Sequence, residues 1–132
     1  MDLLLDTHIF LWWDTGGWDK RDRALNSAAH AAIADPANNI FVSAASVWEV
    51  AIKRRSGKLA FAGSPSAAIS ANGFFALPIL PIDAEGAGSL SWDHSDPFDR
   101  MLVAQAKRAG LTLVTADSLI RAHDGVAVFW AG

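Results

Sequence analysis

The sequence contains no cysteine, which excludes a disulfide framework, a thiolate nucleophile and a cysteine metal site. Its start carries Asp2 and Asp6 within the first apolar run and has no basic lead, so no signal peptide is predicted. The longest apolar run, Phe74 to Ile82, is too short to span a bilayer and contains two prolines. Together these absences indicate a soluble protein, which we expect in the cytoplasm.

The motifs of several enzyme classes are also missing. Gly16 and Gly17 lack the spacing and the Lys-Ser/Thr pair of a P-loop, and there is no G-x-S-x-G nucleophile elbow. The four histidines are scattered, without the His-x3-His spacing that favours zinc. A P-loop nucleotide site and a zinc site are therefore not expected.

The composition is that of a folded domain. The chain has 132 residues, of which 52% are hydrophobic, and we expect one domain over residues 1–132. The net charge of −3 argues against a protein that coats nucleic acid through bulk charge. Four of the eleven basic residues form one cluster between Lys53 and Lys58.

Short apolar runs rich in branched residues predict buried strands, and helical segments separate them. The predicted strands are Leu3–Leu5, Ile40–Val42, Leu111–Val114 and Val126–Trp130, with Ala76–Leu80 as an edge or irregular strand. The predicted helices are His8–Trp13, Asp22–Ala34, Ala44–Arg55, Ser66–Ala71, Ala84–Leu90 and Pro97–Ala109. Strands without alternation, separated by helices, predict a three-layer α/β/α sandwich with a mostly parallel sheet of about five strands.

Two carboxylates follow strands of this predicted sheet. Asp6 ends the run L-L-L-D, and Asp117 ends the run L-V-T-A-D. Sheets of this kind bind ligands beyond the carboxyl ends of their strands. On the helix that Ser43 can cap, Glu49 falls in the same stripe as Ala45 and Ile52.

The stretch D-P-F-D-R-M-L-V-A-Q-A, residues 96–106, holds a second carboxylate inside an apolar stripe. Asp96 before Pro97 is a plausible helix N-cap. Asp99 instead falls at helical spacing with residues that are expected to be buried: Leu102, Val103 and Ala106. A carboxylate in line with core residues needs an explanation.

Each carboxylate also has a structural explanation. These are a helix cap for Asp6 and for Asp117, an ion pair between Glu49 and Lys53, and a capping-box arrangement between Asp99 and Asp96. Several carboxylates on one partly buried edge, however, repel one another and resist ionisation. A divalent cation removes that conflict, and Mg²⁺ or Mn²⁺ suits oxygen ligands better than zinc does.

Four segments, in this order, resemble the PIN domain and, more narrowly, the VapC-type toxins of type II toxin–antitoxin pairs. They are L-L-L-D-T-H, S-A-A-S-V-W-E-V-A-I-K, D-P-F-D-R-M-L-V-A-Q-A and L-V-T-A-D, and the resemblance covers nearly the whole chain. It implies catalytic and metal-binding acids at Asp6, Glu49, Asp99 and Asp117, with none missing. It further implies a Mg²⁺- or Mn²⁺-dependent endoribonuclease, neutralised by a small VapB-like antitoxin and often homodimeric.

Other residues near these acids have candidate supporting roles. Thr7 and Thr115 adjoin carboxylates and are predicted to orient ligands or metal-bound waters. Arg100 and Lys53 are candidate contacts to RNA phosphates. The histidines His8 and His94 are expected to pack or to form hydrogen bonds rather than to bind metal.

The tryptophans are unevenly distributed. Trp12, Trp13 and Trp18 crowd the first helix and its exit, and they cannot all point inward from one short helix. We expect some of them to form an apolar surface for the antitoxin or a second protomer. Trp48 and Trp130 are expected in the core.

Three alternatives have their own sequence requirements. A haloacid-dehalogenase-like phosphatase needs a second aspartate two residues after Asp6, where this chain has His8. A response-regulator-like receiver needs an acidic pair after the first strand and a lysine after the last, and neither is found. A PIN-like protein-binding module without nuclease activity is disfavoured by the intact set of acids. Cleavage of labelled RNA would separate that module from the enzyme.

Overall fold

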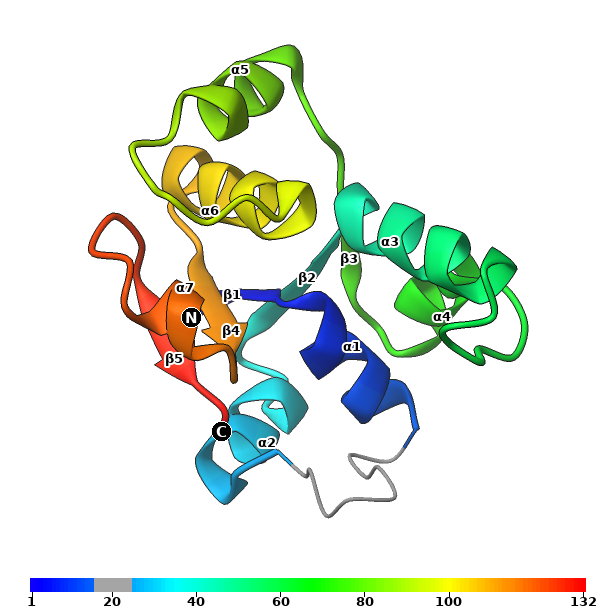
Figure 1. Cartoon of the computed structure of the whole chain (residues 1–132). Helices are drawn as coiled ribbons and strands as arrows, with labels where there is room; N and C mark the ends of the chain where they lie inside the picture. The colour runs from blue at the N-terminus through cyan, green and yellow to red at the C-terminus, as the bar shows by residue number, and fades with distance from the viewer. Residues whose placement is uncertain (16–24) are drawn as a thin grey trace.

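The structure, a computed structural model, describes residues 1–15 and 25–132 (Figure 1). The described strands are β1 (Asp2–Leu5), β2 (Asn39–Ser43), β3 (Phe75–Leu77), β4 (Thr112–Thr115) and β5 (Val128–Trp130). The described helices are α1 (Thr7–Asp14), α2 (Ser27–Ala34), α3 (Ala44–Arg55), α4 (Pro65–Ala71), α5 (Pro81–Ser89), α6 (Pro97–Ala109) and α7 (Ser118–Arg121). Trp18 and the start of the predicted helix Asp22–Ala34 lie outside the described residues.

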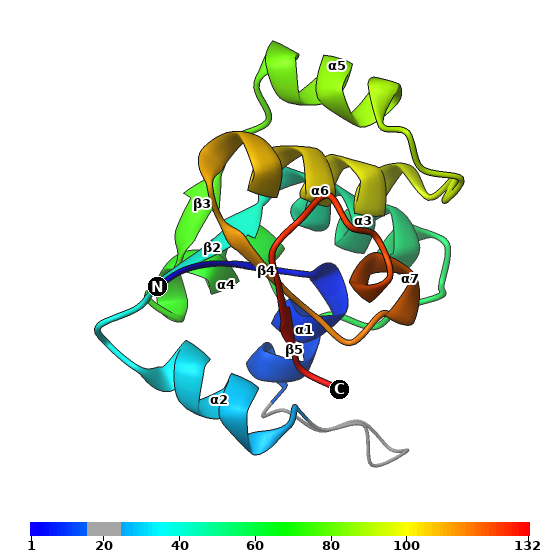
Figure 2. The same ribbon diagram turned by 90° about the vertical axis from the view of Figure 1, so that its left-hand side faces the viewer.

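The strands form one sheet in the order β3-β2-β1-β4-β5, and every neighbouring pair is parallel. Leu5 of β1 aligns with Val42 of β2 on one side and with Val114 of β4 on the other. Because the connections between strands are helical, the sheet is covered on both faces (Figure 2). The predicted three-layer α/β/α sandwich with a parallel sheet is confirmed.

Successive residues of β1 supply the two hydrophobic layers. Leu3 and Leu5 pack on one face with helices α1, α2 and α4, and Leu4 packs on the other face with α6 and α7. Helix α5 lies outside α6, away from the sheet (Figure 2). A strand buried on both faces reads as a continuous apolar run, which is why L-L-L shows no alternation.

The chain reverses its direction of winding at β1, whose neighbours are β2 and β4. Helices leave the sheet directly at the carboxyl ends of these strands: α1 follows Asp6, α3 follows Ser43, and α7 follows Asp117. The Ser43 hydroxyl accepts a hydrogen bond from the Ala45 N–H at 3.0 Å and so starts α3. The polar residues after β1, β2 and β4 therefore meet at one edge.

Some boundaries differ from the sequence prediction. Helix α5 begins at Pro81 rather than Ala84, because the Asp83 carboxylate accepts a hydrogen bond from the Leu80 N–H at 2.8 Å and closes the first turn. The edge strand β3 ends at Leu77, before Pro78, which cannot donate to a ladder. The last strand starts at Val128, two residues later than predicted.

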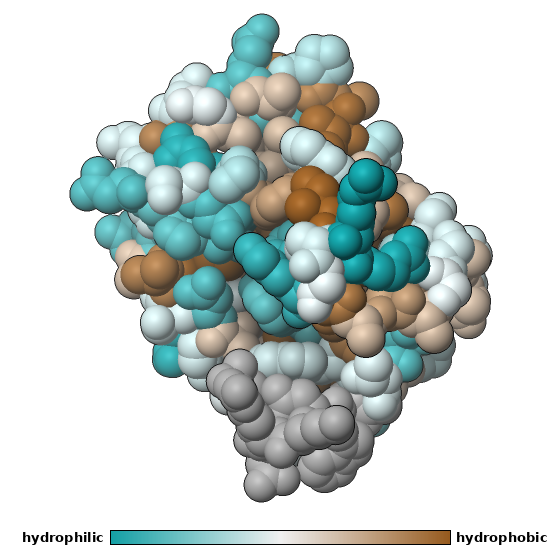
Figure 3. All heavy atoms as spheres, turned by 45° about the vertical axis from the view of Figure 1, so that its right-hand side comes forward, coloured by the Kyte–Doolittle hydropathy of each residue, from teal (hydrophilic) through white to brown (hydrophobic). Residues whose placement is uncertain are grey.

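The expectation that Trp48 belongs to the core is wrong. Trp48 is 59% exposed on α3, where its ring meets the Phe98 ring edge-on at a centroid distance of 5.2 Å. Trp130 is half-buried, with the Arg121 guanidinium 4.4 Å from its ring centroid. Further large apolar side chains are exposed, among them Ile79, Leu80 and Ile82. Figure 3 shows apolar surface in the upper half of the face that it draws. Among the described residues, no helix is long and apolar enough to cross a membrane.

Candidate active site

Asp6 lies at the carboxyl end of β1 and is only 4% exposed. Its Oδ2 accepts a hydrogen bond from the Thr115 hydroxyl at 2.7 Å. Burial raises the pKa of Asp6 above its ordinary value, although the bond from Thr115 opposes the shift. The Thr115 hydroxyl also accepts a hydrogen bond from the Asp117 N–H at 3.0 Å. Thr115 thus connects the two acids that follow β1 and β4.

Glu49 reaches the same edge from α3 and is buried. Its negative charge contributes to the raised pKa of Asp6, which places the two carboxylates near each other. Glu49 also pairs with Lys53, whose Nζ lies 2.5 Å from its Oε2, as the i,i+4 spacing predicted. One turn before Glu49, Ser46 accepts a hydrogen bond from the Thr7 hydroxyl at 2.8 Å. Thr7 therefore joins α1 to α3 through Ser46.

Asp99 enters from the first turn of α6. Asp96 caps that helix, because its Oδ1 accepts hydrogen bonds from the N–H groups of Phe98 and Asp99. The Asp99 carboxylate does not complete a capping box; its Oδ2 lies 2.6 Å from His94 Nε2. Burial raises the pKa of Asp99 to about 7, and the negative charges of nearby carboxylates, Asp6 and Asp117 among them, add to the shift.

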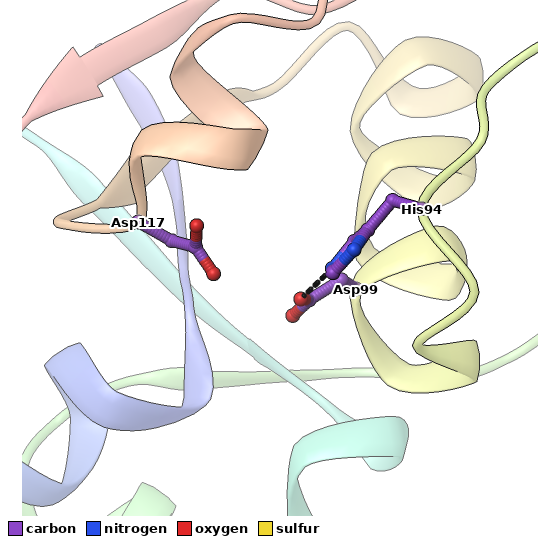
Figure 4. A group of neighbouring side chains, drawn as sticks. All are labelled: His94, Asp99 and Asp117. Atoms are coloured by element: carbon purple, nitrogen blue, oxygen red, sulfur yellow. Dashed lines mark hydrogen bonds and ion pairs between the residues drawn. The ribbon is translucent and has the colours of Figure 1, made fainter.

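Three of these side chains form a compact group of metal-ligand type. One ligand atom each of His94, Asp99 and Asp117 lies within 4.8 Å of the others. In Figure 4 the carboxylates of Asp117, just before α7, and of Asp99, on α6, point toward each other, and His94 reaches Asp99 from the segment before α6. Asp117 also caps α7, since its Oδ1 accepts from the Leu119 N–H at 2.8 Å, so its structural explanation is correct as well.

Two hollows in the surface share His8, and acids line one of them. The first is lined by Asp6, His8, Trp12, Ala116 and Asp117. The second shares His8 and is lined further by Thr7 and two lysines, Lys53 and Lys58. An acidic hollow thus adjoins a hollow with basic residues.

The residues predicted for partner or substrate contact lie as follows. Trp12 and Trp13 are half-buried against the core, and the Trp13 ring lies 5.0 Å from the His30 ring. Trp18 lies outside the described residues. Lys53 is partly exposed beside Glu49. The guanidinium of Arg100 donates hydrogen bonds to backbone carbonyls.

Sequence reasoning did not identify the bond between His94 and Asp99, nor the role of Gln105. Gln105 is fully buried; its Oε1 accepts from the Ser43 hydroxyl at 2.6 Å, and its Nε2 donates to the Pro78 carbonyl at 3.2 Å. It therefore ties α6 to the ends of β2 and β3. A polar residue inside the apolar stripe of α6 was the available signal, the same signal that drew attention to Asp99.

The side chains fit a hard divalent cation. The buried Asp6 and Glu49 and the half-buried Asp99 bring carboxylates toward one edge. Burial, with a smaller contribution from like charge, raises the pKa of Asp6 and of Asp99. Carboxylate oxygens are the ligands that Mg²⁺ and Mn²⁺ prefer, and a cation would offset the repulsion among them. The group of His94, Asp99 and Asp117 contains one histidine, and the sequence has no cysteine, so the ligand set does not favour zinc.

Comparisons with known proteins identify the fold and the family. No curated protein matches the sequence. The fold is similar to that of a chain of VapBC2 from Rickettsia felis, a complex solved with a DNA fragment from the VapBC2 promoter. The identity is 13%, the TM-score is 0.65, and 100% of each chain is covered. It is also similar to a chain of DNA-bound VapBC from Salmonella typhimurium, with 15% identity, a TM-score of 0.62 and 98% of each chain covered. A chain of FitAcB from Neisseria gonorrhoeae has 19% identity, a TM-score of 0.61 and 96% of each chain covered. The family match covers residues 3–126, and the chain belongs to the PIN domain family.

Proposed function

We propose that the chain is a VapC-type, metal-dependent endoribonuclease that hydrolyses RNA phosphodiester bonds in the cytoplasm. The observation that carries the proposal is the convergence of two carboxylates whose pKa values burial raises, the buried Asp6 and the half-buried Asp99. Strongly perturbed acids at the switch point of a parallel sheet are typical of a catalytic site.

Four residues would hold Mg²⁺ or Mn²⁺ in this proposal: Asp6, Glu49, Asp99 and Asp117. The bound cation would supply an activated water and charge stabilisation for in-line attack on the phosphodiester. Thr115 orients Asp6 through its hydroxyl, and Thr7 fixes the position of α1 against α3. Both threonines act behind the carboxylates rather than on the substrate.

The adjoining basic hollow offers a place for the RNA backbone. Lys53 and Lys58 line it beside His8, which also borders the acidic hollow. A lysine ammonium is a point charge suited to phosphate contact. We propose Lys53 as such a contact, because it lies between the lysine-lined hollow and Glu49.

We also propose a small antitoxin as the partner, and a homodimer as the assembly. The structural neighbours are chains of VapBC and FitAB complexes, several of them bound to DNA. Trp12 lines the acidic hollow, so a partner that covers the first helix would reach the carboxylates. An arginine of that partner would pair with them and block the site. Sedimentation of the chain alone and with its antitoxin tests both assemblies.

The experiment is cleavage of end-labelled RNA by the purified chain with Mn²⁺ or Mg²⁺. We expect internal cuts that a chelator stops and that Asp6→Asn abolishes. Cleavage that continues in chelator would contradict the metal-dependent mechanism. Intact RNA together with tight antitoxin binding would favour the protein-binding module, and hydrolysis of a phosphomonoester instead of RNA would favour another phosphohydrolase.

A further inference from the structure

The guanidinium of Arg100 is bound entirely to backbone carbonyls. Its Nε donates to Ala87 O at 2.9 Å, and its two terminal nitrogens donate to Trp92 O at 2.7 Å, Leu90 O at 2.9 Å, His94 O at 3.2 Å and Gly88 O at 3.4 Å. A guanidinium has five N–H donors in a fixed fork, and this set uses each of them. The acceptors belong to the end of α5 and to the segment 90–94 that follows. A phosphate contact by Arg100 would require these bonds to break.

The segment held by Arg100 is the one that carries His94 to the acids. His94 Nε2 lies 2.6 Å from Asp99 Oδ2, and Asp99 directly precedes Arg100 on α6. The first turn of α6 therefore holds the segment at two points, once through the Arg100 guanidinium and once through the Asp99 carboxylate. Figure 4 shows His94 extending from this segment toward Asp99, beside the start of α6.

A stack of rings connects the same segment to the opposite side of the site. The Trp92 ring lies 4.8 Å from the His94 ring and stacks on the His123 ring at 4.6 Å. His123 follows α7, whose N-cap is Asp117. The segment thus contacts both elements that present carboxylates to the group of His94, Asp99 and Asp117.

We propose that Arg100 is a positioning residue that acts through His94. Arg100 clamps the connection between α5 and α6, His94 then holds one oxygen of Asp99, and the other oxygen stays available for a cation shared with Asp117. This inference rests on the metal-dependent function proposed above. Groups that hydrogen-bond a ligating carboxylate set its orientation, and their loss typically weakens metal binding about 10- to 100-fold.

The test is the Mn²⁺ dissociation constant of the full chain, measured by isothermal titration calorimetry. We expect His94→Ala and Arg100→Ala each to bind Mn²⁺ roughly 10-fold more weakly than the wild type. Arg100→Lys should be as weak as Arg100→Ala, because an ammonium cannot reproduce a five-donor fork. His94→Gln should recover much of the affinity, since its amide N–H can donate to Asp99. Wild-type affinity in both Arg100 variants would overturn the proposal and favour a phosphate contact.

A double variant tests whether Arg100 acts through His94. Changes in two residues that act as one unit do not add, so His94→Ala with Arg100→Ala should bind Mn²⁺ within about 2-fold of His94→Ala alone. A loss equal to the product of the two single losses would overturn the coupling.

Arg54→Ala is the matched control for the metal titration. Arg54 also clamps a loop, with its Nη1 donating to Gly63 O at 2.6 Å, but on α3 away from His94. Its variant should bind Mn²⁺ like the wild type, and an equal loss would show general loosening and overturn the proposal. Thermal melts without metal identify folded variants. If Arg100→Ala does not fold, the Mn²⁺ affinities of His94→Ala, His94→Gln and Arg100→Lys test the proposal.

The same variants separate this inference from the proposed function. With RNA as substrate, Arg100→Ala should lower kcat and leave KM unchanged, whereas loss of a phosphate contact would raise KM. If the Mn²⁺ affinities follow the expected pattern but the wild type cuts no RNA, the proposed function fails and the positioning role stands. If the wild type cuts RNA and His94→Ala binds Mn²⁺ normally, the positioning role alone fails.

Discussion

Asp83 and Asp99 both lie in the first turn of a helix, but the fold gives the two carboxylates opposite surroundings. The Asp83 side chain is fully buried on α5, and the Arg108 guanidinium donates to both of its oxygens. Burial alone would raise the pKa of Asp83, but the hydrogen bonds from Arg108 and from the Leu80 N–H outweigh it and lower that pKa. Asp99 has His94 as its side-chain partner, and burial raises its pKa to about 7.

The different surroundings of Asp83 and Asp99 show which carboxylates the protein pairs with a basic side chain of its own. Within residues 1–15 and 25–132, neither Asp6 nor Asp99 forms an ion pair with a lysine or an arginine. A suitable cation is next in sequence to Asp99, yet Arg100 turns to backbone carbonyls. Asp83 is a structural acid that links α5 to α6. Asp6 and Asp99 have no such basic partner among the described residues, so a bound cation would stabilise their charged forms, as in a metal site.

The largest expected effect is on cleavage. Asp6→Asn and Asp99→Asn should each reduce RNA cleavage at least about 100-fold, because each removes a ligand charge at nearly constant volume. Metal-free stability should hold or rise, since a neutral amide relieves the repulsion among the acids. Turnover of labelled RNA and melting curves in chelator measure the two properties. Wild-type turnover by either variant would contradict the metal-site assignment.

Asp83→Asn should show the reverse behaviour. It breaks the buried pair with Arg108, so the melting temperature should fall by roughly 5 °C or more. At a temperature where the variant is folded, cleavage should remain within about 3-fold of the wild type, because Asp83 lies away from the acids. A folded Asp83→Asn variant without activity would remove the distinction between the two kinds of aspartate.

Mn²⁺ should stabilise the protein through the carboxylates of the candidate site, such as Asp6, and not through Asp83. Metal bound solely to the native state raises the melting temperature by mass action, by several degrees at about 100 times the dissociation constant. Scanning calorimetry should show this rise in the wild type and in Asp83→Asn, and a smaller one in Asp6→Asn. An equal rise in all three proteins would mean that the cation binds elsewhere.

The two aspartates should also give opposite pH dependence without metal. Between its ordinary value of 3.8 and about 7, native Asp99 keeps a proton that the unfolded chain releases, so its contribution to stability falls as pH rises through that window. Asp83, whose pKa is lowered, contributes stability above its ordinary value and loses it as pH falls through the native pKa. Melts in chelator at about pH 5.5 and about pH 8 should show a decline of a few degrees that Asp99→Asn reduces, and the raised pKa of Asp6 accounts for the decline that remains.

The sequence predicted the fold well where local pattern and tertiary environment agree. The run L-L-L-D indicated a strand buried on both faces and a carboxylate at its end, and the structure has both. Asp99 was recognised as a candidate because helical spacing places it in line with residues that are buried in the structure. Helix α3 gave a weaker signal, since it is apolar nearly all round from Ala44 to Ile52. That pattern does not show which side faces solvent, so Trp48 was assigned to the core although its ring is open on the surface.

The contacts between neighbouring segments could not be predicted in this way. His94 lies in a connection without helical or strand periodicity, so nothing in the spacing shows that its ring turns back to Asp99. Arg100 was interpreted as a phosphate contact because it is a basic residue beside an acid. Its five carbonyl acceptors come from a segment up to 13 residues earlier in the chain, and only the path of that segment brings them together.

The smallest effect is expected at Asp96, a third kind of acid, whose carboxylate is bound by helix N–H groups. Asp96→Asn should retain cleavage within about 3-fold of the wild type and melt within about 2 °C of it, because asparagine caps helices about as well as aspartate does. Asp96→Ala loses the cap and should melt several degrees lower. The Asp96 charge also helps to raise the pKa of Asp99, so its removal should lower that pKa and shift Mn²⁺ binding slightly toward acid pH. If Asp96→Asn were inactive while Asp99→Asn remained active, the ligand on α6 would be Asp96.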